Sequence, residues 1–361
     1  MIEDQEYILK QILSLVEEQK PEGILIAGDI YDKSIPTEEA VALFDHFLTQ
    51  LHSKQLDIFI ISGNHDSSER INYGGKILGA SGIHIVGTFQ GELEKITMRD
   101  AYGEVKVYLL PFVKPALVNR YFPGVTTYQE AVAAVMGHCE VDPQTRNVLV
   151  AHQFITSGET LPERCDSEQI SVGGLDNVDT AVFEAFDYVA LGHLHGAQRI
   201  GRDTIRYSGS PLKYSFSEAK QVKSITMIEL KEKGTIEITK LPLTPIRDMR
   251  QIKGPIVALT DSKFYCQANT QDYIHAILTD EEELYDAIGK LRSIYPNIMR
   301  LDFENSKSVY QENLKLAAEA VEQKSPFQLF EEFFISQNNN PLSEQQREVM
   351  KKLLDDSEGS V

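Results

Sequence analysis

Apolar and polar positions alternate in blocks along the first third of the chain. Residues 8–16 place isoleucine, leucine and valine on one face of a helix, and residues 24–29 form a short apolar run bounded by glycine. The second pattern predicts a strand that is buried on both faces. A second helix is predicted over 37–54 and a second buried strand over 58–66. Because a helix joins the two strands, we expect them to lie parallel in one sheet.

The remainder of the first 243 residues repeats the strand pattern. We expect strands at 105–112, 147–154, 187–195, 204–211, 224–230 and 235–243. The last three follow one another without a helical pattern between them. The sequence therefore predicts a mixed α/β fold, built as a two-sheet sandwich, over residues 1–243.

A small α+β unit is expected over residues 250–305. We expect strands at 255–260, 273–280 and 299–304 and a helix over 281–296. Three acidic residues, Glu281 to Glu283, open the helical pattern. Negative charge is favourable at a helix N-terminus, so we interpret this run as the first turn of the helix rather than as a binding patch.

The stretch 325–355 contains two short amphipathic segments. The first is rich in phenylalanine, and the second opens with a Ser-x-x-Gln capping box at Ser343 and Gln346. Such segments pack either on their own domain or against a helix of a partner protein, and the pattern leaves both open.

Composition narrows the classes of function. The 361 residues are 42% hydrophobic, enough for a sizeable core, and the formal net charge is −19. A chain this acidic is not a freestanding nucleic-acid coat protein, although metal ions and local fields still permit nucleic acid as a substrate. The three cysteines are widely separated, which predicts buried thiols rather than disulfides. No apolar run approaches the ~20 residues of a membrane span. We therefore expect a reducing, cytoplasmic location and no membrane contact.

One stretch departs from the acidic average. Residues 202–253 hold 11 Lys and Arg against 6 Asp and Glu. The candidate phosphate contacts there are Arg202, Arg206, Lys213 and Lys220. Taken singly, each of these side chains is more often part of a solvated surface than a phosphate contact.

Polar residues of the types that bind metals follow four of the predicted strands. They are Asp29 after the first strand, Asn64, His65 and Asp66 after the second, His152 at the end of 147–154, and His193 and His195 at the end of 187–195. Functional groups gather at the carboxyl ends of strands in open α/β sheets. Packing alone does not account for these residue types at four such ends.

Each residue also has a simpler interpretation. Taken alone, a histidine such as His152 is more often a core or surface residue than a metal ligand. Asp29 could serve as a turn cap, and Asn64 could be an ordinary turn residue. Extended backbone would space His193 and His195 two positions apart along the strand. A turn at the flanking glycines would bring both to one site, or each would bind a different ion.

The set of donor atoms is oxygen and nitrogen without a thiolate. It suits Mn²⁺, Fe²⁺ or Zn²⁺ rather than a structural zinc site. A carboxylate shared by two ions ~4 Å apart is typical of two-metal hydrolases. His65, beside Asn64, is placed to protonate a leaving oxygen, and Asp66 to orient that histidine.

Four segments taken together resemble a known family. They are GDIYD at 28–32, GNHD at 63–66, VAHQ at 150–153 and GHLH at 192–195. In order and spacing they resemble the motifs of the calcineurin-like metallophosphoesterases. Within that superfamily the closest resemblance is to the SbcD family, the nuclease subunits of bacterial SbcCD complexes. The VAHQF form of the third motif, the SGSP stretch at 208–211 and the PFQLFEEFF tail also fit that family, so the resemblance covers essentially the whole chain.

The resemblance implies a role for each site residue. Asp29 would bridge two divalent metal ions, with Mn²⁺ the metal that the family implies. Asn64, His152 and His193 would complete one metal site. His195 would bind the other ion, and His65 would be the catalytic histidine, next to the Asp66 already interpreted as orienting it.

The resemblance also implies an activity and partners. The activity is that of a 3′→5′ double-strand exonuclease and single-strand endonuclease in DNA repair, recombination and replication. The partner is an SMC-like ATPase of the SbcC type, with the chain as a homodimer within a heterotetramer. Residues 250–305 would form a DNA-facing cap domain, and residues 325–355 a helical segment that docks on the ATPase.

One feature of the family is absent. The family opens with a strand ending in Asp-x-His, which supplies two ligands to the metal bound by His195. This chain starts at MIEDQEYIL, which resembles the helix after that strand. We therefore expect weak or no nuclease activity from the chain as written, and a nuclease from a gene product that includes the strand. A start codon assigned too late, a truncated chain and a chain that has lost catalysis would each account for this.

Two other functions use the same residues. The first alternative is a non-catalytic scaffold that holds the ATPase. The second is a small-molecule phosphodiesterase or a protein phosphatase. The appended region 250–355 favours the nuclease over a compact phosphatase, which would not need it.

Overall fold

The computed structural model describes residues 2–168, 176–282, 284–305, 327–328, 330–331, 334 and 342–350. The chain divides into two compact units, Met1–Arg250 and Gln251–Val361. Within the described residues, none of the helices has the length and apolar character needed to cross a membrane.

The first sheet of unit one has three parallel strands. They are β1 (Gly23–Ala27), β2 (Asp57–Ile61) and β3 (Ile83–Val86), in the order β1-β2-β3. Helix α1 (Ile2–Gln19) precedes β1, α2 (Glu38–His52) joins β1 to β2, and the short α3 (Ser68–Ile71) and α4 (Gly75–Gly79) lead into β3. The predicted parallel β-α-β unit is confirmed, whereas β3 was not predicted.

The expected burial of the first strand on both faces is wrong. All five residues of β1 are only half-buried, while four of the five in β2 are buried. The physical reason is position, because β1 lies at the edge of its sheet and β2 in the middle.

The second sheet has six strands in the order β10-β11-β9-β6-β5-β4. Their bounds are β4 Glu94–Asp100, β5 Gly103–Leu110, β6 Arg146–His152, β9 Tyr188–Gly192, β10 Gln198–Ile200 and β11 Arg202–Tyr207. Strands β5, β6, β9 and β11 run parallel, and β4 and β10 are antiparallel edges. Every residue of β6 is buried, as its central place requires.

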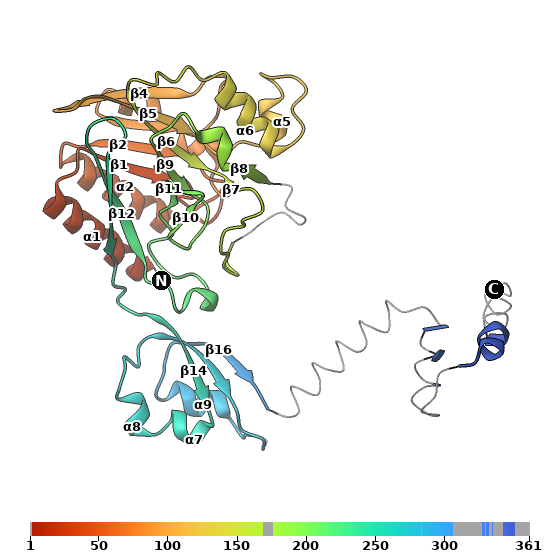
Figure 1. Cartoon of the computed structure of the whole chain (residues 1–361). Helices are drawn as coiled ribbons and strands as arrows, with labels where there is room; N and C mark the ends of the chain where they lie inside the picture. Colours follow the sequence, from red (N-terminus) through yellow and green to blue (C-terminus); the bar gives the residue numbers. More distant parts are fainter. Residues whose placement is uncertain are drawn as a thin grey trace. The chain divides into compact units, whose positions relative to one another are not determined.

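The two sheets pack face to face with helices outside, as Figure 1 shows. Side chains from both sheets form a shared core, with Phe59 and Ile61 of β2 against Leu109 of β5 and Val150 of β6. Helices α1 and α2 cover the outer face of the first sheet. Helices α5 (Pro115–Val118) and α6 (Tyr128–Gly137) cover the second. The predicted two-sheet α/β sandwich is confirmed.

Two pairs of strands complete this unit. β7 (Phe154–Thr156) pairs with β8 (Asn177–Asp179), which leads into the 3₁₀ turn η1 (Thr180–Phe183). A second 3₁₀ turn, η2 (Phe216–Glu218), precedes the hairpin of β12 (Ser224–Leu230) and β13 (Ile236–Pro242). The buried Arg146 guanidinium bonds both Asp100 and the Leu230 carbonyl, so it ties this hairpin to the second sheet.

Unit two is built on a three-stranded sheet whose first strand begins at the division between the units. The sheet order is β14 (Met249–Gly254), β15 (Tyr273–Leu278) and β16 (Ile298–Phe303). Helices α7 (Ile256–Leu259), α8 (Ser262–Tyr265) and α9 (Ala287–Arg292) accompany it. The fully buried Leu259, Ile274 and Leu291 belong to its core, as an α+β unit over 250–305 requires.

Two expectations for this unit are wrong. Residues 255–260 form helix α7 instead of a strand, because the Asp280 carboxylate accepts the Ile256 N–H at 2.8 Å and so supports a helix start. The helix predicted over 281–296 begins at Ala287 rather than at the acidic run, because Asp286 caps it by accepting the Gly289 N–H at 3.1 Å. Glu281 and Glu282 precede this helix, and Glu283 lies outside the described residues.

Most of the stretch 325–355 lies outside the described residues, including Leu329 and Phe333. Residues 344–350 are helical, and the Ser343 N–H donates to Gln346 Oε1 at 2.9 Å. Gln346 N–H lies 3.4 Å from Ser343 Oγ, so the predicted capping box is confirmed.

Candidate metal centre

The carboxyl ends of β1, β2, β6 and β9 bring one set of predicted residues together. One ligand atom each from Asp29, His152 and His193 lies within 4.8 Å of the other two. Asn64 joins them, with its Oδ1 3.0 Å from His152 Nε2 and 2.9 Å from His193 Nδ1. Four of the seven residues predicted for the site therefore converge on one point.

Glycines make this close approach possible. A Cβ atom at Gly63 would lie 2.1 Å from Asp29 Oδ1, and one at Gly28 would lie 2.4 Å from His152 Nδ1. Any side chain at either position would push the site residues apart. Both glycines, Gly28 of the GD motif and Gly63 of the GN motif, are thus required because the strand ends pack too closely for a side chain.

The backbone is unusual at two of the site residues. Asp29 has a φ of 52° and His193 a φ of 99°, a region that residues other than glycine rarely adopt. For His193 this conformation follows directly after β9 ends at Gly192, so the chain leaves the extended path there. Such conformations concentrate at functional sites, where the surrounding structure holds them in place.

Hydrogen bonding fixes which nitrogen of His152 is free. Nδ1 lies 2.6 Å from the main-chain oxygen of Ala27, so Nδ1 carries the proton and donates it. The lone pair of Nε2 then lies 3.0 Å from Asn64 Oδ1 and 3.2 Å from Asp29 Oδ2. Lone pairs that face one another need a cation between them, so this donor set fits a divalent metal ion.

Electrostatics keeps the donors in the form that binds metal. Burial alone would raise the pKa of Asp29, but hydrogen bonding and charge from His152 in its doubly protonated form outweigh burial and lower the pKa to about 2. Burial, together with His152, lowers the pKa of His193 to about 3. At neutral pH the carboxylate is charged and this imidazole is neutral, as metal binding requires.

Asp66 holds two of the motif loops together. Its carboxylate accepts the N–H groups of Gly63 at 2.8 Å, Tyr31 at 3.0 Å and Ile30 at 3.1 Å. Burial outweighs these hydrogen bonds and raises the pKa of Asp66. The residue therefore fixes the loop after β1 against the loop after β2.

His65 lies beside this cluster, with the backbone N–H donating to Asp29 Oδ1 at 3.0 Å. Its Nδ1 is 2.9 Å from the main-chain oxygen of Asp32, so Nδ1 donates and Nε2 is left with a lone pair. Its orienting contact is thus the Asp32 carbonyl, which the sequence did not suggest. A role for Asp66 in orienting His65 stays a prediction.

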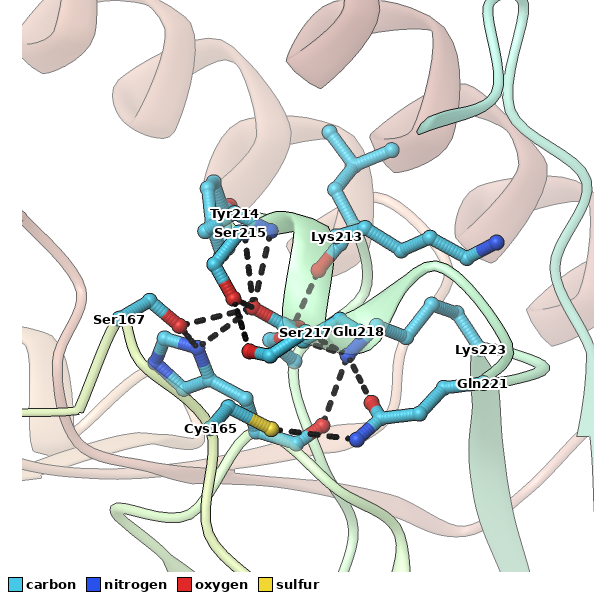
Figure 2. Close-up of polar contacts among 12 residues, drawn as sticks. Cys165, Ser167, Lys213, Tyr214, Ser215, Ser217, Glu218, Gln221 and Lys223 are labelled. Carbon is cyan, nitrogen blue, oxygen red and sulfur yellow. Dashed lines mark hydrogen bonds and ion pairs between the residues drawn. The ribbon is translucent and has the colours of Figure 1, made fainter. Parts of the chain in front are cut away.

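His195 is not one of the three clustered donors. Its N–H donates to Glu168 Oε1 at 2.7 Å, and its Nδ1 lies 2.8 Å from Ser167 Oγ. Behind Ser167 lies the ion pair of Glu218 and Lys223, whose Oε2 and Nζ are 2.6 Å apart (Figure 2). Burial would raise the pKa of Glu218, but hydrogen bonds from His195 and Lys223 hold it well below its usual range.

Sequence reasoning missed Ser167, Glu168, Glu218 and Lys223. One signal was present, since Ser215 and Glu218 have capping-box spacing and do form one at η2. The contacts that join these residues to His195, and the contact between Ser167 and Glu218, span 23 to 51 positions, which no local pattern reveals.

Three of the four candidate phosphate contacts are engaged within the chain. Arg202 donates to the Phe183 carbonyl, Arg206 lies 3.9 Å from Asp203, and Lys213 pairs with Asp248 at 2.8 Å. Lys220 is exposed. Cys139, Cys165 and Cys266 are free thiols, and Cys266 is exposed rather than buried as expected.

Comparison with known proteins covers both units. Residues 2–197 match the calcineurin-like phosphoesterase family, and residues 245–338 match the type 5 capsule protein repressor C-terminal domain. The chain is 33% identical over 360 residues to the SbcD subunit of the nuclease SbcCD of Staphylococcus epidermidis, spanning 98% of this chain and 93% of that protein. A solved structure, the phosphopantetheinyl hydrolase of Mycobacterium tuberculosis, is similar over 52% of this chain and 79% of its own. Its sequence identity is 16% and its TM-score 0.30.

Proposed function

Because the chain belongs to the calcineurin-like phosphoesterases and is a homologue of the SbcD nuclease subunits, we propose that it is the metal-dependent nuclease subunit of a two-component DNA-processing complex. Its activities are those of a 3′→5′ double-strand exonuclease and a single-strand endonuclease in DNA repair, recombination and replication. The observation that carries this proposal is the convergence of Asp29, His152 and His193 at the ends of three strands.

The metal ligands come from the strand ends. Asp29, Asn64, His152 and His193 would hold one divalent ion, and Asp29 and His195 would contribute to a second, with Mn²⁺ the preferred metal. The support is the lone pair of His152 Nε2, which faces Asn64 Oδ1 at 3.0 Å and Asp29 Oδ2 at 3.2 Å. The chemistry supplied by bound ions is charge neutralisation of the phosphodiester and activation of water near neutral pH.

His65 delivers the proton to the leaving oxygen of the phosphodiester. Its Nδ1 is engaged with the Asp32 carbonyl at 2.9 Å, so Nε2 is the atom that gains and gives up the proton. Asp66 preserves the arrangement by holding Gly63, Ile30 and Tyr31 in place.

The second unit and the C-terminal stretch serve DNA and the partner. Residues 250–305 form a DNA-facing cap, and 325–355 dock on an SMC-like ATPase of the SbcC type, with two copies of this chain in a heterotetramer. The support is the match of residues 245–338 to a C-terminal domain family, together with a relative named as one subunit of a complex. Much of the affinity for DNA then comes from the ATPase, in keeping with the net charge of −19. The complex acts in the cytoplasm.

Weak or no activity is expected from the chain as written, so the test uses the chain preceded by a strand that ends in Asp-x-His, co-purified with its ATPase partner. With Mn²⁺ and ATP, the complex should shorten end-labelled duplex DNA from 3′ ends and cut circular single strands. The variant His65→Gln should lose this activity, whereas His46→Gln, the same change at an exposed histidine of α2, should retain it.

Three results would contradict the proposal. Turnover of bis-p-nitrophenyl phosphate without DNA cleavage would identify a small-molecule phosphodiesterase. Tight ATPase binding with neither DNA cleavage nor a second Mn²⁺ would identify a scaffold. Equal activity in His65→Gln and His46→Gln would remove His65 from the chemistry.

A further inference from the structure

A fully buried carboxylate lies behind the imidazole of His195. The side chain of Glu218 is 0% exposed and that of its partner Lys223 is 5% exposed. Lys223 Nζ donates to Glu218 Oε2 at 2.6 Å and also meets the His195 carbonyl at 2.8 Å. Figure 2 shows this lysine beside Glu218 and Gln221, whose Oε1 is 2.9 Å from Nζ. Oε2 of Glu218 is therefore held by an ammonium group.

The other oxygen of Glu218 is surrounded by donors. Oε1 accepts the backbone N–H groups of Tyr214 at 3.1 Å and Ser215 at 3.0 Å. It also accepts the hydroxyls of Ser215 at 3.1 Å and Ser167 at 2.7 Å. Since both oxygens face donors, neither carries a proton, and the Ser167 hydroxyl has to donate to Glu218.

This direction of bonding decides the state of the imidazole. A serine hydroxyl has one proton, and Ser167 uses it on Glu218, so toward His195 its oxygen can only accept. His195 Nδ1, 2.8 Å from Ser167 Oγ, is then the donor. The reverse tautomer would place the Nδ1 lone pair against Ser167 Oγ and 3.4 Å from the Glu218 carboxylate. With the proton on Nδ1, the lone pair of Nε2 is free.

We propose that Ser167, oriented by the buried Glu218 carboxylate, is a positioning residue that holds His195 in the tautomer with a free Nε2 lone pair for a divalent cation. This inference rests on the proposed function, in which His195 is a metal ligand. The main chain of His195 is fixed as well, since Glu168 accepts its N–H at 2.7 Å and Lys223 donates to its carbonyl at 2.8 Å. Both the ring and its backbone are thus set before a metal arrives.

The first readout is the tautomer of His195 in metal-free protein. Two-bond ¹⁵N–¹H correlation spectra of histidine-labelled protein distinguish Nδ1–H from Nε2–H rings. Among the nine histidines, the signals lost in His195→Asn identify this residue. We expect Nδ1–H in the wild type and a shift toward Nε2–H in Ser167→Ala. Glu218 can take over only in part, because Lys223 and two backbone N–H groups hold its carboxylate 3.4 Å from Nδ1, which makes a long hydrogen bond.

A matched control separates positioning from packing. Ser215→Ala removes a hydroxyl from the same Glu218 oxygen, and that hydroxyl bonds Glu218 and Ser217 rather than His195. It should leave the His195 tautomer unchanged. Ser167→Thr keeps the hydroxyl and should restore the wild-type spectrum. Both alanine variants leave the Glu218–Lys223 pair intact, so both should fold.

The second readout is Mn²⁺ binding by calorimetry. Ser167→Ala should lower the affinity for the Mn²⁺ ion that His195 binds by about 10–100-fold. This is the usual effect of losing a hydrogen-bond partner of a metal-binding histidine. Ser215→Ala and Ser167→Thr should bind like the wild type.

Several outcomes would overturn the inference. They are an Nε2–H ring in the metal-free wild type, an unchanged tautomer in Ser167→Ala, or equal Mn²⁺ affinity in the two alanine variants. Failure of the wild-type complex to bind Mn²⁺ or cleave DNA would instead count against the proposed function. The metal-free spectra decide the positioning role in either case.

Discussion

His152 Nε2 and Asn64 Oδ1 lie 3.0 Å apart although 88 positions separate the two residues. The same oxygen is 2.9 Å from His193 Nδ1, so Asn64 is the point at which the two histidines meet. An amide oxygen carries no charge, and it therefore adds a ligand atom beside Asp29 without adding repulsion.

Removal of this oxygen should weaken metal binding. Asn64→Ala is expected to lower Mn²⁺ affinity by at least about 10–100-fold, the range seen when even indirect partners are lost. Calorimetry on the metal-free protein measures the effect. Asn119→Ala, at an exposed asparagine whose side chain bonds the Gly124 N–H, should bind Mn²⁺ like the wild type. Equal affinities in the two variants would show that Asn64 is not a ligand.

Asp66 should matter for stability before any chemistry. An asparagine at this position retains one acceptor oxygen for three backbone N–H groups, so Asp66→Asn should cost about 1–3 kcal/mol of unfolding free energy. Urea denaturation of the metal-free protein measures this change. Asp32→Asn is the control, because that residue meets His65 through its main-chain oxygen and its side chain is exposed. Equal midpoints for the two variants would rule out the loop-holding role.

The lowered pKa of Asp29 predicts a pH dependence of stability. The pKa is about 2 in the folded protein, below the roughly 3.9 of an unfolded chain. The carboxylate thus stabilises the fold above about pH 4, by about 2 kcal/mol, and this is lost as pH falls toward 2. The difference in unfolding free energy between wild type and Asp29→Asn, measured in EDTA, should shrink over that interval. A difference that does not vary with pH would contradict the assigned pKa.

The buried ion pair should be sensitive to loss of one partner. Lys223→Met leaves Glu218 charged, 0% exposed and without its ammonium partner, which should cost about 3–5 kcal/mol of unfolding free energy. Chemical denaturation again gives the value. Lys10→Met removes a lysine that pairs with Glu6 at 2.6 Å but is 63% exposed, and should have little effect. A small effect at both positions would mean that water reaches Glu218.

Much of the fold followed from residue patterns for identifiable reasons. The apolar runs that became β2 and β6 are buried in the middle of their sheets, where burial dominates every local preference. The ends of parallel strands share one edge, which is why Asp29, His152 and His193 could be expected together. The failures had local causes too. Residues 255–260 carry a short apolar run that suits a strand or a helix equally, and the decision came from Asp280, 24 positions away.

The network around His195 was beyond sequence reasoning. Ser167 and Glu218 are 51 positions apart and lie in segments with no strong periodicity. Their importance arises from burial and from the direction of hydrogen bonds, and both are properties of the tertiary structure. The sequence offered His195 as a ligand but no indication of which ring nitrogen would be free.

The contacts that build the site join distant parts of the chain, and this has a consequence for folding. His152 meets Ala27 across 125 positions and His193 meets Asn64 across 129. Contacts of such separation form only after long loops close, which slows folding and places them late. The strands of the first sheet alone supply Asp29 and Asn64 but neither histidine. During refolding, the time at which amide hydrogens gain metal-dependent protection from exchange would therefore report when the two sheets dock.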